Sequence, residues 1–205
     1  YFLMRELKKH KFSKVYDLQN SSRTTFYKNI LYPKAGHEVW SSSYTTLPLE
    51  QDKNEFDRIS VLERFNHQLE ISGLNVLNTI KPDFTWAATD ISEIKSHYNL
   101  KKYILLFPFC SPHLIIKKWP YYKDLIKLIL DKLNNEYQIV TAPGPNEIKD
   151  AKNINALALL DNGRALDISQ LTSLVKDSSF VIANDTGPAH IAAHVGAKGL
   201  TLFGK

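Results

Sequence analysis

Residues 180–204 read FVIANDTGPAHIAAHVGAKGLTLFG, and this stretch indicates the fold more clearly than any other. Phe180–Asn184 is a short apolar run typical of a buried strand. Thr186–Val195 favours a helix, with Pro188 in the first turn, where its missing N–H removes no helical hydrogen bond. Gly199–Phe203 is a second strand-like run. Strand, helix and strand in this order predict a parallel pair joined by a helical crossover.

The same alternation extends upstream. Tyr103–Pro108 is continuously apolar, as expected of a strand buried on both faces. Two further strands are predicted at Tyr137–Ala142 and Asn155–Leu160. The intervening segments favour helices at Ile91–Leu100, Trp119–Asn134 (with Pro120 in its first turn), Pro145–Lys152 and, after a capping box at Asp167, up to Lys176. The pattern predicts an α/β fold with a doubly wound parallel sheet and helices on both faces.

The first part of the chain shows a weaker alternation. Helices are predicted at Tyr1–His10, at Ser21–Ile30 and, closed by Gly73, at Glu55–Ser72, with short strands at Lys14–Gln19 and Glu38–Ser42. Residues 74–88 have no clear period and contain a proline, so we interpret them as a connection between domains. The predicted domains are therefore residues 1–88 and 89–205.

Composition places the chain among ordinary globular proteins. Apolar residues make up 43% and charged residues 23% of the 205 residues, which disfavours disorder and coiled coil. The apolar runs are too short to span a bilayer. Cys110 is the single cysteine, which fits a reducing cytoplasm, and we interpret it as a small buried side chain. The formal charge of +5 favours anionic partners, but zinc-type spacing and RNA-binding signatures are absent, so nucleic acid is not expected.

Ligands of such sheets bind beyond the carboxyl ends of the strands. The loop Asn184–His190 follows a strand and opens a helix, whose free first-turn amides and positive dipole end suit a phosphate. Gly187 lets a ligand approach the backbone, Thr186 offers a hydroxyl, and His190 lies one turn away on the same face. Asp185 would repel a diphosphate and is expected to accept hydrogen bonds from sugar hydroxyls or to orient His190. A plain helix cap at Asp185 or Thr186 is the simpler alternative.

Two other loops follow predicted strands. In Pro108–Pro120, Ser111 can donate to a phosphate, and Lys117 and Lys118 supply cations close to the next helix. In the loop after Ala142, Glu147 can hold ribose hydroxyls, although an acidic first-turn residue also complements its own helix dipole. Solvated lysines are the simpler alternative for the basic pair. Trp119 is interpreted as a core residue that anchors its loop.

These motifs together resemble glycosyltransferase family 9, the ADP-heptose:lipopolysaccharide heptosyltransferases. Residues 180–204 are similar to the family signature, and Pro108–Ser111 and Lys117–Pro120 to its Pro-Gly-Ala-Ser and Lys-Arg-Trp-Pro turns. Pro143–Glu147 resembles its Gly-x-x-x-Glu turn. Lys14–Arg23 resembles a strand and turn of its first domain. Phe109 departs from the pattern, because the family has a glycine at that place.

The resemblance implies two Rossmann-like domains of GT-B type, the first truncated at its N-terminus, with an acceptor-side domain at 1–88 and a nucleotide-sugar domain at 89–205 that lacks its C-terminal end. It implies an enzyme: an inverting, metal-independent transfer of heptose or a related sugar from an ADP-sugar to a lipopolysaccharide core or similar glycolipid. No cofactor is expected, and the location implied is cytoplasmic, with peripheral contact at the inner face of the inner membrane. The implied donor-binding residues are Ser111, Lys117, Glu147, Asp185, Thr186, Gly187 and His190.

No catalytic residue is assigned, because the resemblance places the family's base upstream of Tyr1. The chain by itself is therefore expected to be inactive. Three alternatives stay open at this point: a UDP- or GDP-sugar transferase, a sugar-nucleotide 2-epimerase of the same fold, and a nucleotide-binding module without catalysis.

Overall fold

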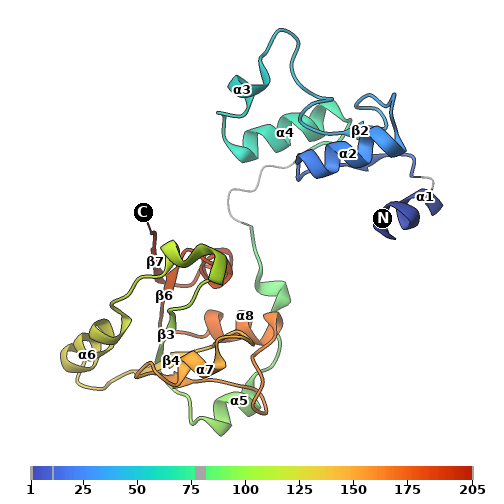
Figure 1. Cartoon of the computed structure of the whole chain (residues 1–205). Helices are drawn as coiled ribbons and strands as arrows, with labels where there is room; N and C mark the ends of the chain where they lie inside the picture. Colours follow the sequence, from blue (N-terminus) through green and yellow to red (C-terminus); the bar gives the residue numbers. More distant parts are fainter. Residues whose placement is uncertain (1, 11, 77–81, 205) are drawn as a thin grey trace. The chain divides into compact units, whose positions relative to one another are not determined.

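The computed structural model describes residues 2–10, 12–76 and 82–204, and the chain divides into two compact units, residues 1–80 and 81–205 (Figure 1). The division lies eight residues before the boundary that we placed at 88/89. The reason is that Phe84–Thr89 packs on the second unit: the Phe84 N–H donates to the His194 carbonyl at 3.1 Å, and the Thr89 N–H donates to Ser173 Oγ at 2.8 Å. The predicted connection 74–88 includes residues 77–81, which lie outside the described part.

The first unit is a small α/β unit. It contains α1 (Phe2–Lys9), β1 (Val15–Tyr16), α2 (Ser22–Leu31), β2 (Trp40–Ser41), α3 (Lys53–Phe56) and α4 (Val61–Ile71). The strands β1 and β2, which come before and after α2 in the sequence, pair in parallel. A buried amide network lies beneath them, in which Gln68 Nε2 donates to the carbonyl oxygens of Asp17 and Ser41 at 3.0 and 3.1 Å.

The single helix predicted at Glu55–Ser72 is wrong, because the structure breaks it between α3 and α4. Ser60 forms a capping box with Glu63: Ser60 Oγ accepts from the Glu63 amide, and the Glu63 carboxylate accepts from the Ser60 amide. This reciprocal cap satisfies two amides and starts a new helix at Val61. The predicted end holds, since Gly73 follows the helix with a left-handed φ of 85°.

The second unit contains a five-stranded parallel sheet with helices on both faces. Its elements are η1 (Thr85–Ala87), α5 (Ser92–His97), β3 (Tyr103–Phe107), η2 (Pro112–Lys117), α6 (Tyr122–Lys132), β4 (Gln138–Thr141), α7 (Ile148–Ala151), β5 (Leu157–Ala158), α8 (Ile168–Lys176), β6 (Phe180–Asn184), α9 (Gly187–His194) and β7 (Gly199–Leu202). The strand order is β5-β4-β3-β6-β7. All four pairings are parallel, so the predicted α/β class is confirmed.

Alternate residues of the central strand enter two separate cores. Leu105 and Phe107 pack with residues of α5, α8 and α9, whereas Ile104 and Leu106 pack against Tyr122 and Ile126 of α6. Figure 1 shows α6 on one side of the strands and α5 and α8 on the other. Full burial of each such side chain stabilises the fold by about 2 kcal/mol, which is why this strand is apolar throughout.

Two helix starts differ from the prediction. The helix α6 begins at Tyr122, so Pro120 lies before it and not in its first turn. The residues just upstream instead form the short 3-10 helix η2, which the sequence analysis did not anticipate. The helix α8 begins as predicted, with a capping box between Asp167 and Gln170. Among the described helices, none has the length and apolar character needed to cross a membrane.

Candidate functional site

The sheet has its switch point at β3. The chain runs from β3 outward to β4 and β5 on one side, and then returns to place β6 and β7 on the other. The loops that leave the carboxyl ends of β3 and β6 therefore diverge, and a crevice opens between them. All three loops selected from the sequence leave strands at this edge.

A cavity of about 240 Å³ lies at this edge. Ser111, Glu147 and Thr186, which come from three different loops, all line it, so the structure brings these predicted site residues together. Its remaining wall is mostly apolar and includes Leu166 and Leu171, which the sequence analysis did not select. Sequence gave no signal for these leucines, because one precedes α8 and the other sits within its apolar stripe.

An ion pair joins the β3 and β6 loops. Lys117 Nζ donates to Asp185 Oδ2 at 2.6 Å and to the Asp185 main-chain oxygen at 3.3 Å. The two side chains are 32% and 24% exposed, so both charges remain accessible from solvent. His190 Nε2 lies 3.9 Å from the other carboxylate oxygen, Oδ1, and the His190 side chain is 70% exposed. Asp185 thus has the Lys117 ammonium at one carboxylate oxygen and the His190 ring beside the other.

The start of α9 is open to a ligand. Thr186 occupies the N-cap position, yet its hydroxyl donates to the Asn184 carbonyl at 3.2 Å and caps no helix amide. Of the first-turn positions of α9, Pro188 has no N–H and the Ala189 amide donates to the Thr186 carbonyl at 3.0 Å. The Gly187 amide is therefore the first-turn donor to which the described residues give no acceptor. A Cβ built on Gly187 would meet nothing within 4 Å, so this glycine faces open space. The simple cap expected as an alternative for Thr186 is therefore not formed by its side chain.

Glu147 folds back on its own loop. Its Oε2 accepts from the Gly144 amide at 2.8 Å, and it occupies the N-cap position of the four-residue helix α7. Within the described part of the chain, Oε1 has no hydrogen-bond partner. One carboxylate oxygen thus fixes the loop while the carboxylate also borders the cavity.

Asn184, at the end of β6, is a buried residue that the sequence analysis did not assign to the site. It is fully buried and connects two loops: its Oδ1 accepts from the Trp119 amide and the Tyr122 hydroxyl, and its Nδ2 donates to the Phe109 carbonyl, each at 3.3 Å. A buried amide needs such partners. The sequence feature that could have identified Asn184 is its position, because it is a polar residue at the end of an otherwise apolar strand.

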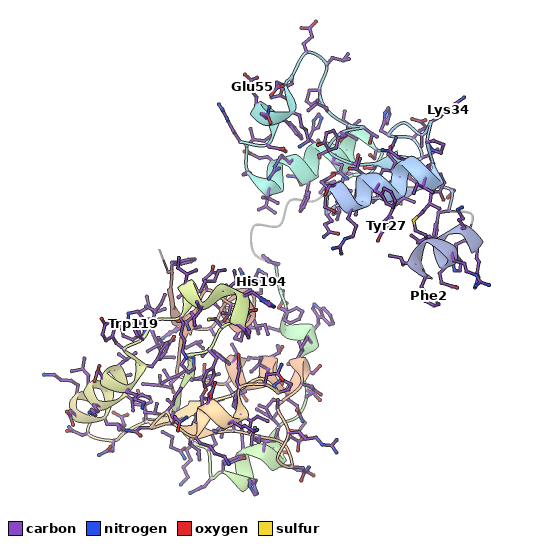
Figure 2. The ribbon with its side chains drawn as sticks, in the orientation of Figure 1. Phe2, Tyr27, Lys34, Glu55, Trp119 and His194 are labelled. Atoms are coloured by element: carbon purple, nitrogen blue, oxygen red, sulfur yellow. The ribbon has the colours of Figure 1, made fainter. Side chains whose placement is uncertain are left out.

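Three other expectations for these loops can be compared with the structure. Trp119, labelled in Figure 2, is half-buried: it packs against the α6 core from its edge and makes edge-to-face contacts with Tyr121 and Tyr122, and its role as a loop anchor stays a prediction. Cys110 is only half-buried, so its interpretation as a buried side chain is wrong: the loop turns outward there, and Sγ contacts the Leu114 carbonyl at 3.4 Å. Lys118 borders a neighbouring hollow together with Ser111 and Glu147.

This arrangement defines a class: an α/β protein whose parallel sheet carries a ligand cavity, a cation and an open helix start at its switch point. The chain belongs to glycosyltransferase family 9 (heptosyltransferase), since that family matches residues 1–205. A search of the curated proteins gave no match.

Several solved structures share the fold of this chain. A glycosyl transferase family 9 protein from Veillonella parvula superposes with a TM-score of 0.62 at 15% identity, over 98% of this chain and 60% of that one. The E. coli heptosyltransferase WaaC with ADP-2-deoxy-2-fluoro heptose gives 0.60 at 16%, over 98% and 64%. E. coli ADP-heptose lps heptosyltransferase II gives 0.57 at 16%, over 98% and 66%. The chain thus spans about two-thirds or less of the length of each.

Proposed function

We propose that the protein transfers heptose or a related sugar from an ADP-sugar to a lipopolysaccharide core or similar glycolipid, with inversion and without a metal or other cofactor. One observation carries the proposal: Lys117 and the open start of α9 meet beside a cavity lined by Ser111, Glu147 and Thr186. Family membership supports transfer chemistry, and two solved structures of one relative in fold, WaaC with ADP and WaaC with ADP-2-deoxy-2-fluoro heptose, support the nucleotide.

Each predicted residue has a role in this proposal. Lys117, Thr186, Gly187 and His190 bind the diphosphate, and Ser111 contributes its hydroxyl from the β3 loop. The free oxygen of Glu147 accepts from the ribose hydroxyls. The adenine base of the nucleotide occupies the apolar part of the cavity, against Leu166 and Leu171. Asp185 faces the sugar, because a carboxylate accepts from hydroxyls and repels phosphate.

The proposed transfer is a displacement at the anomeric carbon. The acceptor oxygen forms a bond to that carbon while the bond to the phosphate oxygen breaks, and the departing diphosphate takes the electron pair. The Lys117 ammonium, the Gly187 amide and the positive end of the α9 dipole stabilise the charge that develops on the leaving group. The acceptor hydroxyl gives up its proton as the new bond forms, and we assign the general base that takes this proton to no residue of this chain.

We propose further that the acceptor is reached at the cytoplasmic surface of the inner membrane. The support comes from α1, in which Phe2 and Leu3 are 78% and 51% exposed beside the basic residues Arg5, Lys8 and Lys9. An exposed apolar face flanked by basic residues suits an anionic lipid surface. Cosedimentation with phosphatidylglycerol vesicles, and not with phosphatidylcholine vesicles, is the expected result; equal pelleting with both or with neither contradicts it.

Calorimetric titration of ADP and UDP tests the nucleotide site. We expect saturable ADP binding that weakens more than about tenfold, or roughly 1.4 kcal/mol, in Lys117→Ala. Lys127→Ala, which removes an exposed lysine of α6, is the matched control and leaves affinity unchanged. A preference for UDP would overturn the ADP donor but keep the site. If the folded protein binds neither ADP nor UDP, the proposal is overturned, and the alternatives that also need a bound nucleotide gain no support.

A further inference from the structure

The side chain proposed to bind phosphate is already occupied in the structure. Lys117 Nζ uses two of its three donors on one residue, Asp185, through the carboxylate at 2.6 Å and the main-chain carbonyl at 3.3 Å. A phosphate that approaches Lys117 must therefore compete with the Asp185 carboxylate. It must also come to lie beside that carboxylate, since Asp185 directly precedes the α9 start.

The charges around Asp185 do not cancel once a diphosphate arrives. Of the described side chains, the Lys117 ammonium pairs with the carboxylate, and His190 Nε2 lies 3.9 Å from its other oxygen. Both are also the groups that a phosphate would take as partners. A bound diphosphate thus leaves Asp185 with weaker neutralisation and a new negative neighbour, and two like charges a few ångströms apart repel each other at a partly solvated site.

A sugar on the terminal phosphate relieves this conflict in two ways. Esterification removes the ionisation that the terminal phosphate of a free nucleoside diphosphate has near neutral pH, so the ligand carries less negative charge. The sugar hydroxyls also give Asp185 the donors that it loses when Lys117 turns to phosphate. Free nucleoside diphosphate offers neither compensation.

We propose that Asp185 is a specificity-determining residue that discriminates between the sugar-loaded nucleotide and the spent nucleoside diphosphate. The proposal rests on the proposed function, because it needs the nucleotide to bind beside Lys117. Before the donor arrives, Asp185 holds the Lys117 ammonium at the site. After transfer, the carboxylate loses its sugar partner, regains Lys117 and lowers the affinity for the product, which speeds its release.

The test uses ADP and ADP-glucose as probes in calorimetric titrations of the wild-type chain and Asp185→Asn. Asparagine keeps the size of the side chain but removes its charge. We expect ADP to bind about fivefold more tightly to the variant, in the range that close charge pairs at partly solvated sites produce. ADP-glucose should bind no better or more weakly, so the preference for ADP-glucose over ADP falls by about fivefold or more.

A control and a salt series separate this role from a structural one. Asp177→Asn removes the carboxylate of a comparable ion pair, with Lys95, elsewhere in the same unit, and should leave both affinities unchanged. The ADP gain of Asp185→Asn should shrink in high salt, because a repulsion between partly exposed charges is screened. If Asp185→Asn fails to fold by circular dichroism, Asp185→Ser replaces it.

The outcomes are distinct. ADP binding with an unchanged ADP-glucose to ADP preference in the variant overturns this inference and leaves the proposed function intact. Weaker ADP binding by a folded variant also overturns it, because Asp185 would then act only by positioning Lys117. Failure of the folded wild-type chain to bind ADP at all overturns the proposed function and the inference with it.

Discussion

Replacing Asn184 by alanine tests whether one buried side chain holds the loops of the site. The side chain is fully buried and makes three hydrogen bonds of 3.3 Å, to the Trp119 amide, the Tyr122 hydroxyl and the Phe109 carbonyl. Tyr122 keeps a second partner, because its hydroxyl also lies 3.2 Å from the Phe107 carbonyl. The Trp119 amide and the Phe109 carbonyl lose the partner that the structure gives them.

The magnitude follows from these contacts. At 3.3 Å the bonds are at the long end of the range, so each lost partner costs about 1 kcal/mol, the lower limit for a buried polar group. Two such groups and the space left by the removed amide give a loss of about 2–4 kcal/mol in the free energy of unfolding. For a unit of this size, the melting temperature should fall by roughly 10 °C.

Urea unfolding followed by tryptophan fluorescence measures this loss, since Trp119 lies next to Asn184 and reports on this part of the second unit. Asn153→Ala, at an exposed asparagine of the same unit, is the matched control and should change stability by less than about 0.5 kcal/mol. Tyr122→Phe should give an intermediate loss of about 1 kcal/mol. If Asn184→Ala and Asn153→Ala unfold at the same urea concentration, the role assigned to Asn184 is refuted.

Two further predictions concern two glycines and one tyrosine. Gly199→Ala should lower the free energy of unfolding by about 1–3 kcal/mol, because the new Cβ would lie 2.7 Å from the Val181 carbonyl oxygen. Gly187→Ala, with open space around the new Cβ, should leave stability unchanged, and equal melting temperatures of the two variants in thermal unfolding would contradict this. Burial, and to a lesser degree the charge of Asp177, raises the pKa of Tyr103 well above its ordinary value. The unfolded chain ionises first, so stability should fall as pH rises above about 10, and urea titrations should show a shallower fall for Tyr103→Phe; parallel pH profiles would refute it.

Local signals in the sequence predicted several elements correctly. Tyr103–Phe107 is apolar because both of its faces are buried, and Asp167 with Gln170 forms the capping box that starts α8. The break at Ser60 was also encoded locally, by Ser60 and Glu63, but the apolar period of the surrounding residues masked it. Competing local signals of similar strength are resolved only by the packing of the folded chain.

The sequence by itself determined the class of fold and which loops lie at the carboxyl-end edge of the sheet, since strand periodicity, caps and the carboxyl-end rule depend on neighbours along the chain. Tertiary structure decided the strand order, the pairing of Lys117 with Asp185 across 68 residues, and the burial of Asn184 between two loops. Such contacts form only when distant segments pack together, and a contact between residues far apart leaves no periodic trace in the sequence around either of them.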